Sequence, residues 1–126
     1  MCARALQAVA IAICFAPSVA PADQPIDQKA AVSGVITGLG PTRAEVEKRI
    51  LERRSTAGAG EGVVVRQFPA SSQEFLSYGT VSANGTLVGF NQKWGVVVVL
   101  DPLYGNGAVT WRCKVFPPVA APQACK

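Results

Sequence analysis

The chain of 126 residues contains no histidine, and only 16% of its residues are charged. The absence of histidine removes the commonest general base, the usual metal ligand and the Ser-His and Cys-His nucleophile pairs. The serines also lack the Ser-x-x-Lys spacing and the glycine-flanked turn that mark a nucleophilic serine. The sequence therefore predicts no enzyme and no bound cofactor.

Positive charge is scarce as well. The formal net charge of +4 is too small to indicate a nucleic-acid-binding protein by itself. Four basic residues gather late in a helical region, but three glutamates interleave with them and cancel much of their field. The cluster comprises Lys48, Arg49, Arg53 and Arg54, interleaved with Glu45, Glu47 and Glu52. We interpret it as a solvated helix end, so nucleic acid is the less favoured partner.

The first 22 residues are typical of a secretory signal peptide. Arg4 supplies the positive start, an apolar stretch covers residues 5–16, and Ala20-Pro21-Ala22 fits a small-x-small cleavage site. The apolar stretch is too short to span a bilayer comfortably. We therefore expect a mature domain of residues 23–126, periplasmic or secreted and without a stable membrane span. An uncleaved short anchor is the alternative.

Cleavage after Ala22 would remove two of the four cysteines and leave Cys113 and Cys125 as one pair. In an oxidising compartment an even pair of this kind predicts a disulfide. It would join the tail of the chain to its last predicted strand. Two cysteines without histidine cannot supply the ligands of a zinc site, so no metal site is expected.

Helical periodicity follows the predicted signal peptide. Apolar residues recur at i, i+3, i+4 and i+7, which is typical of an amphipathic helix: Val32, Val35, Ile36 and Leu39. Gly38, Gly40 and Pro41 are expected to end or kink this helix. The sequence Thr42-Arg43-Ala44-Glu45 has the pattern of a capping box, which predicts a second or restarted helix from Arg43.

That second helix has its own two faces. Val46 and Ile50 are expected to face inward, while Glu45 and Arg49 form an i, i+4 pair outside. A glycine-rich segment, 57–62, follows it and precedes the strand-like residues 63–65. A phosphate-binding loop needs the opposite order, strand then loop then helix, so we interpret this segment as a linker.

The rest of the chain predicts an antiparallel sheet. Segments 80–82 and 86–90 flank an Asn-Gly turn at 84–85, which is a hairpin pattern. The β-branched run 96–100 is apolar on both faces and predicts a central strand covered on both sides. Asp101-Pro102 should end that strand, because proline has no N–H to donate.

A second turn and a last strand complete this sheet. Asn106-Gly107 favours a turn with positive φ, and the returning segment 108–113 alternates between apolar and polar residues. The predicted fold is α+β: an N-terminal helical segment packed on an antiparallel sheet of about three to five strands, with a disulfide-closed C-terminal loop.

The end of the chain resembles bacterial type IV pilins. The resemblance rests on Val109-Thr110-Trp111-Arg112-Cys113, a proline-bearing loop and Pro122-Gln123-Ala124-Cys125-Lys126, and it runs from about Ser77 to the end. It implies a pilin-like globular domain, fibre-forming or fibre-associated, whose cysteine-closed loop is exposed for adhesion or subunit contacts. The basic leader, Gly-Phe-Thr-Leu-type cleavage site and long apolar helix of prepilins have no match here, which favours an accessory subunit.

The candidate binding loop runs from residue 114 to residue 124. Loops held by a rigid scaffold often carry recognition, and this one has two apolar residues among prolines and two basic residues beside them. These candidates are Arg112, Lys114, Phe116 and Val119. The alternative is that Phe116 and Val119 fold back to cap the sheet.

The expected partners are proteins, either pilus components or host-cell surface molecules. A small soluble periplasmic or secreted binding protein or inhibitor, acting through the same loop, is the alternative function. A truncated pilin fragment joined to a signal sequence is a third interpretation.

Overall fold

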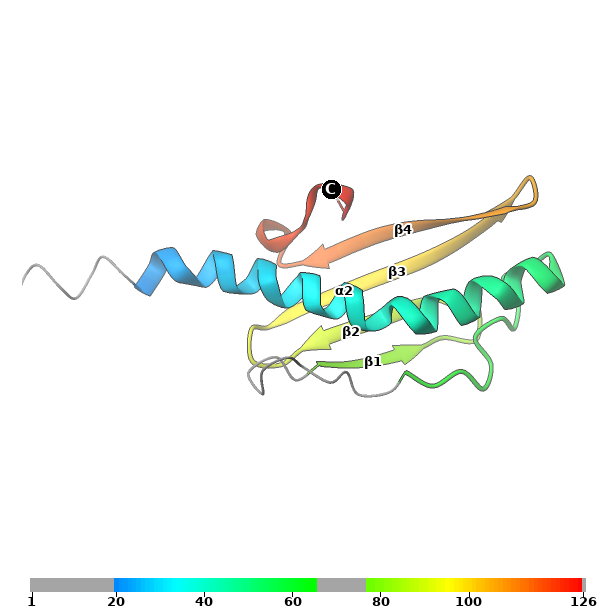
Figure 1. The fold of residues 1–126 in the computed structure, drawn as a ribbon, viewed down its shortest axis with the longest axis horizontal. Coiled ribbons are helices and arrows are strands. Elements are labelled where there is room, and N and C mark those ends of the chain that lie inside the picture. Colours follow the sequence, from blue (N-terminus) through cyan, green and yellow to red (C-terminus); the bar gives the residue numbers. More distant parts are fainter. Residues whose placement is uncertain (1–19, 66–76, 126) are drawn as a thin grey trace, which may run out of the picture.

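The computed structural model describes residues 20–65 and 77–125, as one long helix, a four-stranded sheet and two short 3-10 helices. The helix crosses one face of the sheet, and its first turns project beyond the strands (Figure 1). The sheet is antiparallel throughout, in the order β1-β2-β3-β4. The elements are α2 Ala20–Arg53, β1 Ser77–Val81, β2 Leu87–Asn91, β3 Val96–Gly105, β4 Ala108–Phe116, η2 Pro118–Ala120 and η3 Gln123–Cys125. The predicted α+β fold is confirmed.

Helix α2 is continuous, so the expectation that it ends at residues 38–41 and restarts at Arg43 is wrong. Leu39 and Val46 lie seven residues apart, close to two helical turns, and both are fully buried. The apolar stripe therefore stays on one face across Pro41. An interior proline costs about 3 kcal/mol, and burial of several large side chains on this stripe outweighs that cost. The predicted pair between Glu45 and Arg49 is present, at 3.3 Å.

The predicted signal-peptide boundary, after Ala22, lies within the first turn of α2. Residues 1–19 lie outside the described residues, so cleavage at this boundary stays a prediction. In the described part of the chain, no helix is both long and apolar enough to cross a membrane.

The core lies between α2 and one face of the sheet. Alternate residues of β2 and β3 point toward the helix, including Leu87, Val96 and Val98, and all three are fully buried. Gly89 sits directly beneath the helix, where a Cβ atom would lie 2.9 Å from the Cδ1 atom of Leu39. The absence of a side chain at Gly89 therefore allows α2 to pack close to the sheet.

Strand β3 is internal to the sheet, as predicted, but only one of its faces is fully buried. Val97 and Val99 are half-buried, so the expectation of cover on both sides is wrong. The strand also continues past Asp101-Pro102 to Gly105. Strand β2 pairs with β3 only as far as Leu100, so Pro102 lies where β3 has a neighbour on one side. Proline is tolerated at such an open edge.

Two of the three hairpins, β1–β2 and β3–β4, follow the predicted turns. Asn106 and Gly107 both have positive φ, 54° and 76°, and connect β3 to β4. The β1–β2 connection contains Gly85 at φ 89°, and a five-residue loop separates the paired residues Val81 and Leu87. Both Asn-Gly turns are therefore confirmed, although the first lies in a longer loop than a two-residue hairpin.

The segment after α2 consists of turns, which agrees with the linker interpretation. Its last described residues, Val63 to Val65, do not form the predicted strand. Val63 is buried and Val64 is 77% exposed, but neither pairs with a neighbouring strand. The predicted chain break at residues 67–72 lies outside the described residues.

Candidate functional site

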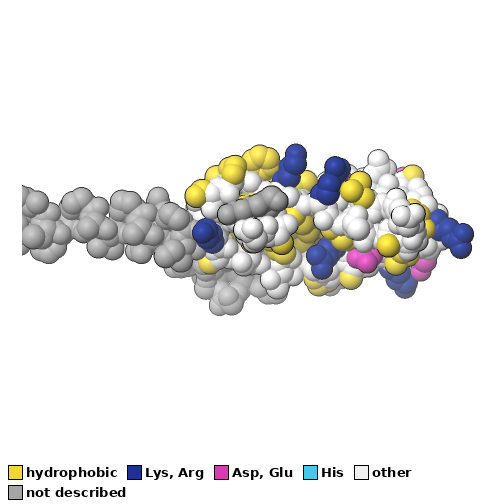
Figure 2. All heavy atoms as spheres, turned by 90° about the horizontal axis from the view of Figure 1, so that it is seen from above, with side chains coloured by type: hydrophobic (Ala, Val, Ile, Leu, Met, Phe, Trp, Pro, Cys, Tyr) yellow, Lys and Arg dark blue, Asp and Glu magenta, His cyan; other side chains and the backbone are white. Residues whose placement is uncertain are grey.

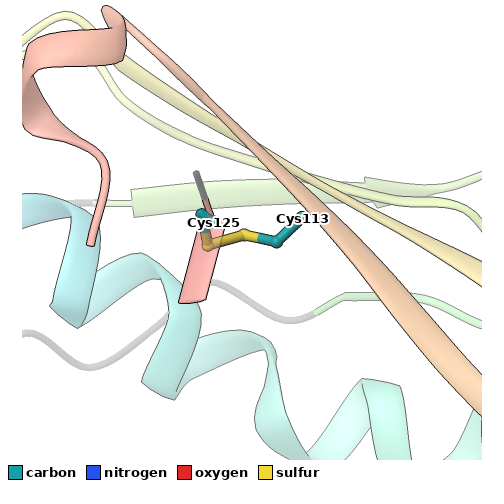
Figure 3. The surroundings of a disulfide bond; sticks show 2 residues. All are labelled: Cys113 and Cys125. Carbon is teal, nitrogen blue, oxygen red and sulfur yellow. A yellow bond between two sulfur atoms is a disulfide. The ribbon is translucent and has the colours of Figure 1, made fainter. Parts of the chain in front are cut away.

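The C-terminal loop begins where β4 ends. Strand β4 continues to Phe116, three residues further than predicted, and the proline-bearing segment then forms the short helices η2 and η3. The predicted disulfide is present: Cys113 of β4 bonds to Cys125, with their Cα atoms 4.7 Å apart. Figure 3 shows this bond connecting the β4 ribbon to the C-terminal turn. The disulfide therefore closes the segment from Cys113 to Cys125 into a ring.

Two alanines fix this loop to the body of the protein. Ala120 and Ala121 are 1% and 6% exposed and belong to the core that includes the α2 stripe. The backbone N–H groups of both residues donate to carbonyls at the start of the loop, those of Pro117 and Pro118. Small side chains here let the segment lie close against its neighbours, so the loop has a defined position.

The two apolar candidates point outward. Phe116 is 51% exposed and Val119 is 64% exposed. The alternative in which they fold back to cap the sheet is therefore wrong, and the buried alanines occupy that place. An exposed phenylalanine is unremarkable alone, but here an exposed phenylalanine at the end of β4 is followed three residues later by an exposed valine in η2.

The two basic candidates differ in their surroundings. Arg112 Nη2 lies 2.7 Å from Asp101 Oδ2, and Asp101 Oδ1 accepts a hydrogen bond of 2.8 Å from the Thr86 hydroxyl. Lys114 is exposed and forms no ion pair among the described residues. Arg112 therefore serves mainly to tie β4 to β3, whereas Lys114 keeps its charge available.

Sequence reasoning missed the role of Asp101, which it assigned only to a strand end. The hydrogen bond from Arg112, followed by the bond from Thr86, lowers the pKa of the Asp101 carboxyl below its ordinary value of 3.8. Partial burial opposes this effect, and the positive charges of Arg112 and Lys114 add to it. The only available signal was the cross-strand register of Asp101 and Arg112, which needs the turn position to be known.

An Asp101→Asn variant is expected to be less stable than the wild type at pH 7, by under about 1 kcal/mol because the pair is exposed. The extra stability of the wild type is fully present above pH 3.8, the ordinary pKa of the carboxyl. It is lost as the pH falls through the lower pKa that Asp101 has in the folded protein. Urea unfolding of both proteins at pH 7 and at about pH 2 measures the difference. A difference that persists unchanged in acid would contradict this assignment, and Glu52→Gln is the control.

Of the basic helix end, Arg49 makes internal contacts, while Lys48, Arg53 and Arg54 are exposed. Arg49 Nη1 donates to the carbonyl oxygen of Glu61 at 2.6 Å, and Arg49 Nη2 pairs with Glu45. Glu47 accepts a hydrogen bond of 3.1 Å from Trp111 Nε1, which links α2 to β4. These side chains stabilise the contacts of α2 with its neighbours. The exposure of the other three basic residues agrees with the interpretation of the cluster as a solvated helix end.

Within residues 20–65 and 77–125, no group of three or more acidic, histidine or cysteine side chains is placed to hold a metal ion. The fold and the loop define an α+β domain with a single helix on an antiparallel sheet and an exposed, disulfide-closed loop. Comparisons with protein-family models, curated proteins and solved structures find no match to this chain.

Proposed function

We propose that this chain is an exported pilin-like structural or adhesion protein, a pilus-associated or accessory subunit that binds a protein partner through its C-terminal loop. The observation that carries the proposal is the exposure of Phe116 and Val119 on a loop closed by the Cys113–Cys125 disulfide. The sequence resemblance to type IV pilins at the end of the chain supports the same role. A disulfide is also compatible with the periplasm or the cell surface.

The physical basis is preorganisation. Ordering a free tail on binding costs about 0.5–1.5 kcal/mol for each flexible side chain that is fixed. Here the disulfide and the buried residues Ala120 and Ala121 have already restricted the loop. A partner that covers Phe116 and Val119 gains apolar burial without that full cost.

A matched pair of double variants tests this role. Phe116→Ser with Val119→Ser removes the exposed apolar side chains of the loop. Leu51→Ser with Val64→Ser removes two exposed apolar side chains elsewhere. Retention of each purified protein on isolated pili and on host cells is measured. We expect at least a tenfold weaker retention for the loop variant and no change for the control.

The other outcomes separate the alternatives. Equal retention of both variants would contradict the loop as the binding site. Loss only on changing Arg53→Ala and Arg54→Ala, with a steep salt dependence, would indicate an electrostatic partner such as nucleic acid. If the loop variant loses binding to a secreted enzyme, and pili bind neither protein, the function is that of a small inhibitor.

A further inference from the structure

The face of the sheet opposite α2 carries an apolar row that crosses all four strands. The cross-strand register pairs Tyr78 with Phe90, Phe90 with Val97, and Val97 with Phe116. Their chain neighbours on β2 and β3 point toward α2 and are buried, so these four side chains point away from it. We call the four residues the outer row. It ends at Phe116, where the C-terminal loop begins.

The outer row is accessible. Tyr78 is 37% exposed and Phe116 is 51% exposed, while Phe90 and Val97 between them are half-buried. The rings of Tyr78 and Phe90 stack on each other, with centroids 5.7 Å apart. Figure 2 shows hydrophobic side chains gathered along one rim of the molecule, with Lys and Arg side chains beside them. The exposure of Tyr78 and Phe116 makes the outer row an accessible apolar surface.

The side chains of the neighbouring rows determine the net charge beside the outer row. The next row is Thr80, Val88, Val99 and Lys114, and beyond it Asp101 faces Arg112. Asp101 and Arg112 neutralise each other at 2.7 Å. Lys114 lies one row away from this pair, so together the three side chains leave one net positive charge beside the apolar surface. A complementary partner carries an acidic group at that point.

The size of the surface selects the kind of partner. Strands about 4.8 Å apart and rows about 6.6 Å apart give these two rows an area on the order of 250 Å². A stable protein interface usually needs about 800 Å² from each side, so this surface is too small to hold a second copy of the chain by itself. An extended peptide of about five residues covers it.

From these observations we propose that the outer row binds an extended acidic peptide segment of the partner protein. Apolar side chains on alternate peptide positions lie against Tyr78, Phe90 and Phe116, and an aspartate or glutamate meets Lys114. This inference rests on the proposed function, because Phe116 belongs both to the loop and to the outer row. It extends the binding surface from the loop onto the sheet.

A displayed library of random peptides, selected on the immobilised full chain, tests the chemistry. We expect enrichment of peptides with apolar residues at alternate positions and an acidic residue among them. The Lys114→Glu protein is expected to select lysine or arginine at that position instead, and Lys48→Glu on α2 is the control for net charge. Identical selections on wild type and Lys114→Glu would overturn the proposal.

A second measurement locates the peptide without disturbing the core. Thr80 and Thr110 are both exposed on the outer face of the sheet, but Thr80 lies in the row beside the outer row and Thr110 lies on the projecting β3–β4 hairpin. Thr80→Glu would bury an unpaired carboxylate under the peptide. The change should therefore weaken the binding of a peptide that was selected on the wild-type protein at least tenfold. Thr110→Glu should leave it unchanged. Equal effects would overturn the location.

The remaining outcomes distinguish this inference from the proposed function. If Val119→Ser weakens retention on pili but Thr80→Glu does not, the loop functions alone and only the outer-row proposal fails. If neither variant weakens it, both fail. Concentration-dependent self-association abolished by Thr80→Glu would assign the surface to a second copy. Binding to phosphatidylglycerol-containing vesicles abolished by Lys114→Glu would assign it to a membrane, and either result overturns the peptide.

Discussion

Loss of the Cys113–Cys125 disulfide is expected to lower the free energy of unfolding by about 3 kcal/mol. The two cysteines lie 12 residues apart, and opening a loop of that size returns this much chain entropy to the unfolded state. A domain of this size has a total stability of only about 5–15 kcal/mol. The melting temperature should therefore fall by roughly 10–15 °C.

The measurement compares thermal unfolding of the wild type, before and after reduction, with the double variant Cys113→Ser and Cys125→Ser. Ala124→Ser is the matched control, because Ala124 lies beside Cys125 in η3 and is exposed. The double variant and the reduced wild type should melt together, well below the control. Thiol labelling that finds both cysteines reactive in the native protein, purified without reductant, would contradict the disulfide.

A Leu39→Ala variant is expected to lose about 3–5 kcal/mol of stability. Leu39 is fully buried at the middle of α2. Its Cδ atoms approach Gly79 of β1 and Gly89 of β2, neither of which has a side chain that can fill the space. A cavity at this position cannot collapse easily, so the cost should lie toward the upper end of the usual range.

Leu51→Ala is the control for this change, since Leu51 lies in the same helix but is 44% exposed. Both substitutions alter helix propensity equally, so the difference between them isolates core packing. Denaturant unfolding should show a small effect at Leu51, under about 1 kcal/mol. A loss at Leu39 no larger than that at Leu51 would show that α2 does not pack on the sheet as described.

Local chemistry in the sequence determined the sheet half of the molecule. Two Asn-Gly pairs predicted two of the three hairpins, because only a few residue types accept the positive φ that these turns need. Alternation from Val109 to Cys113 predicted which face of β4 is half-buried. The disulfide was predicted from the two cysteines that remain after the expected cleavage at Ala22. Each of these signals acts over a few residues, so no knowledge of distant parts was required.

The helix shows where local rules fail. Gly38-Leu39-Gly40-Pro41 has the composition of a break, yet α2 runs through it because Leu39 and Val46 are both buried on one stripe against the sheet. Strand β3 likewise passes Pro102, which lies where β2 has already ended. In both cases the cost of proline depends on neighbours that the local sequence does not specify.

Only the tertiary structure decided how the candidate site is arranged. The pairing of Arg112 with Asp101, the exposure of Phe116 and the alignment of the outer row all depend on the register of strands that are distant in the chain. A shift of one residue in that register would turn Tyr78 or Phe116 toward α2. The residue types at the site were visible in the sequence. Which of these side chains share a face of the sheet, and which charges are paired, depends on strand register and on packing of the sheet against the helix.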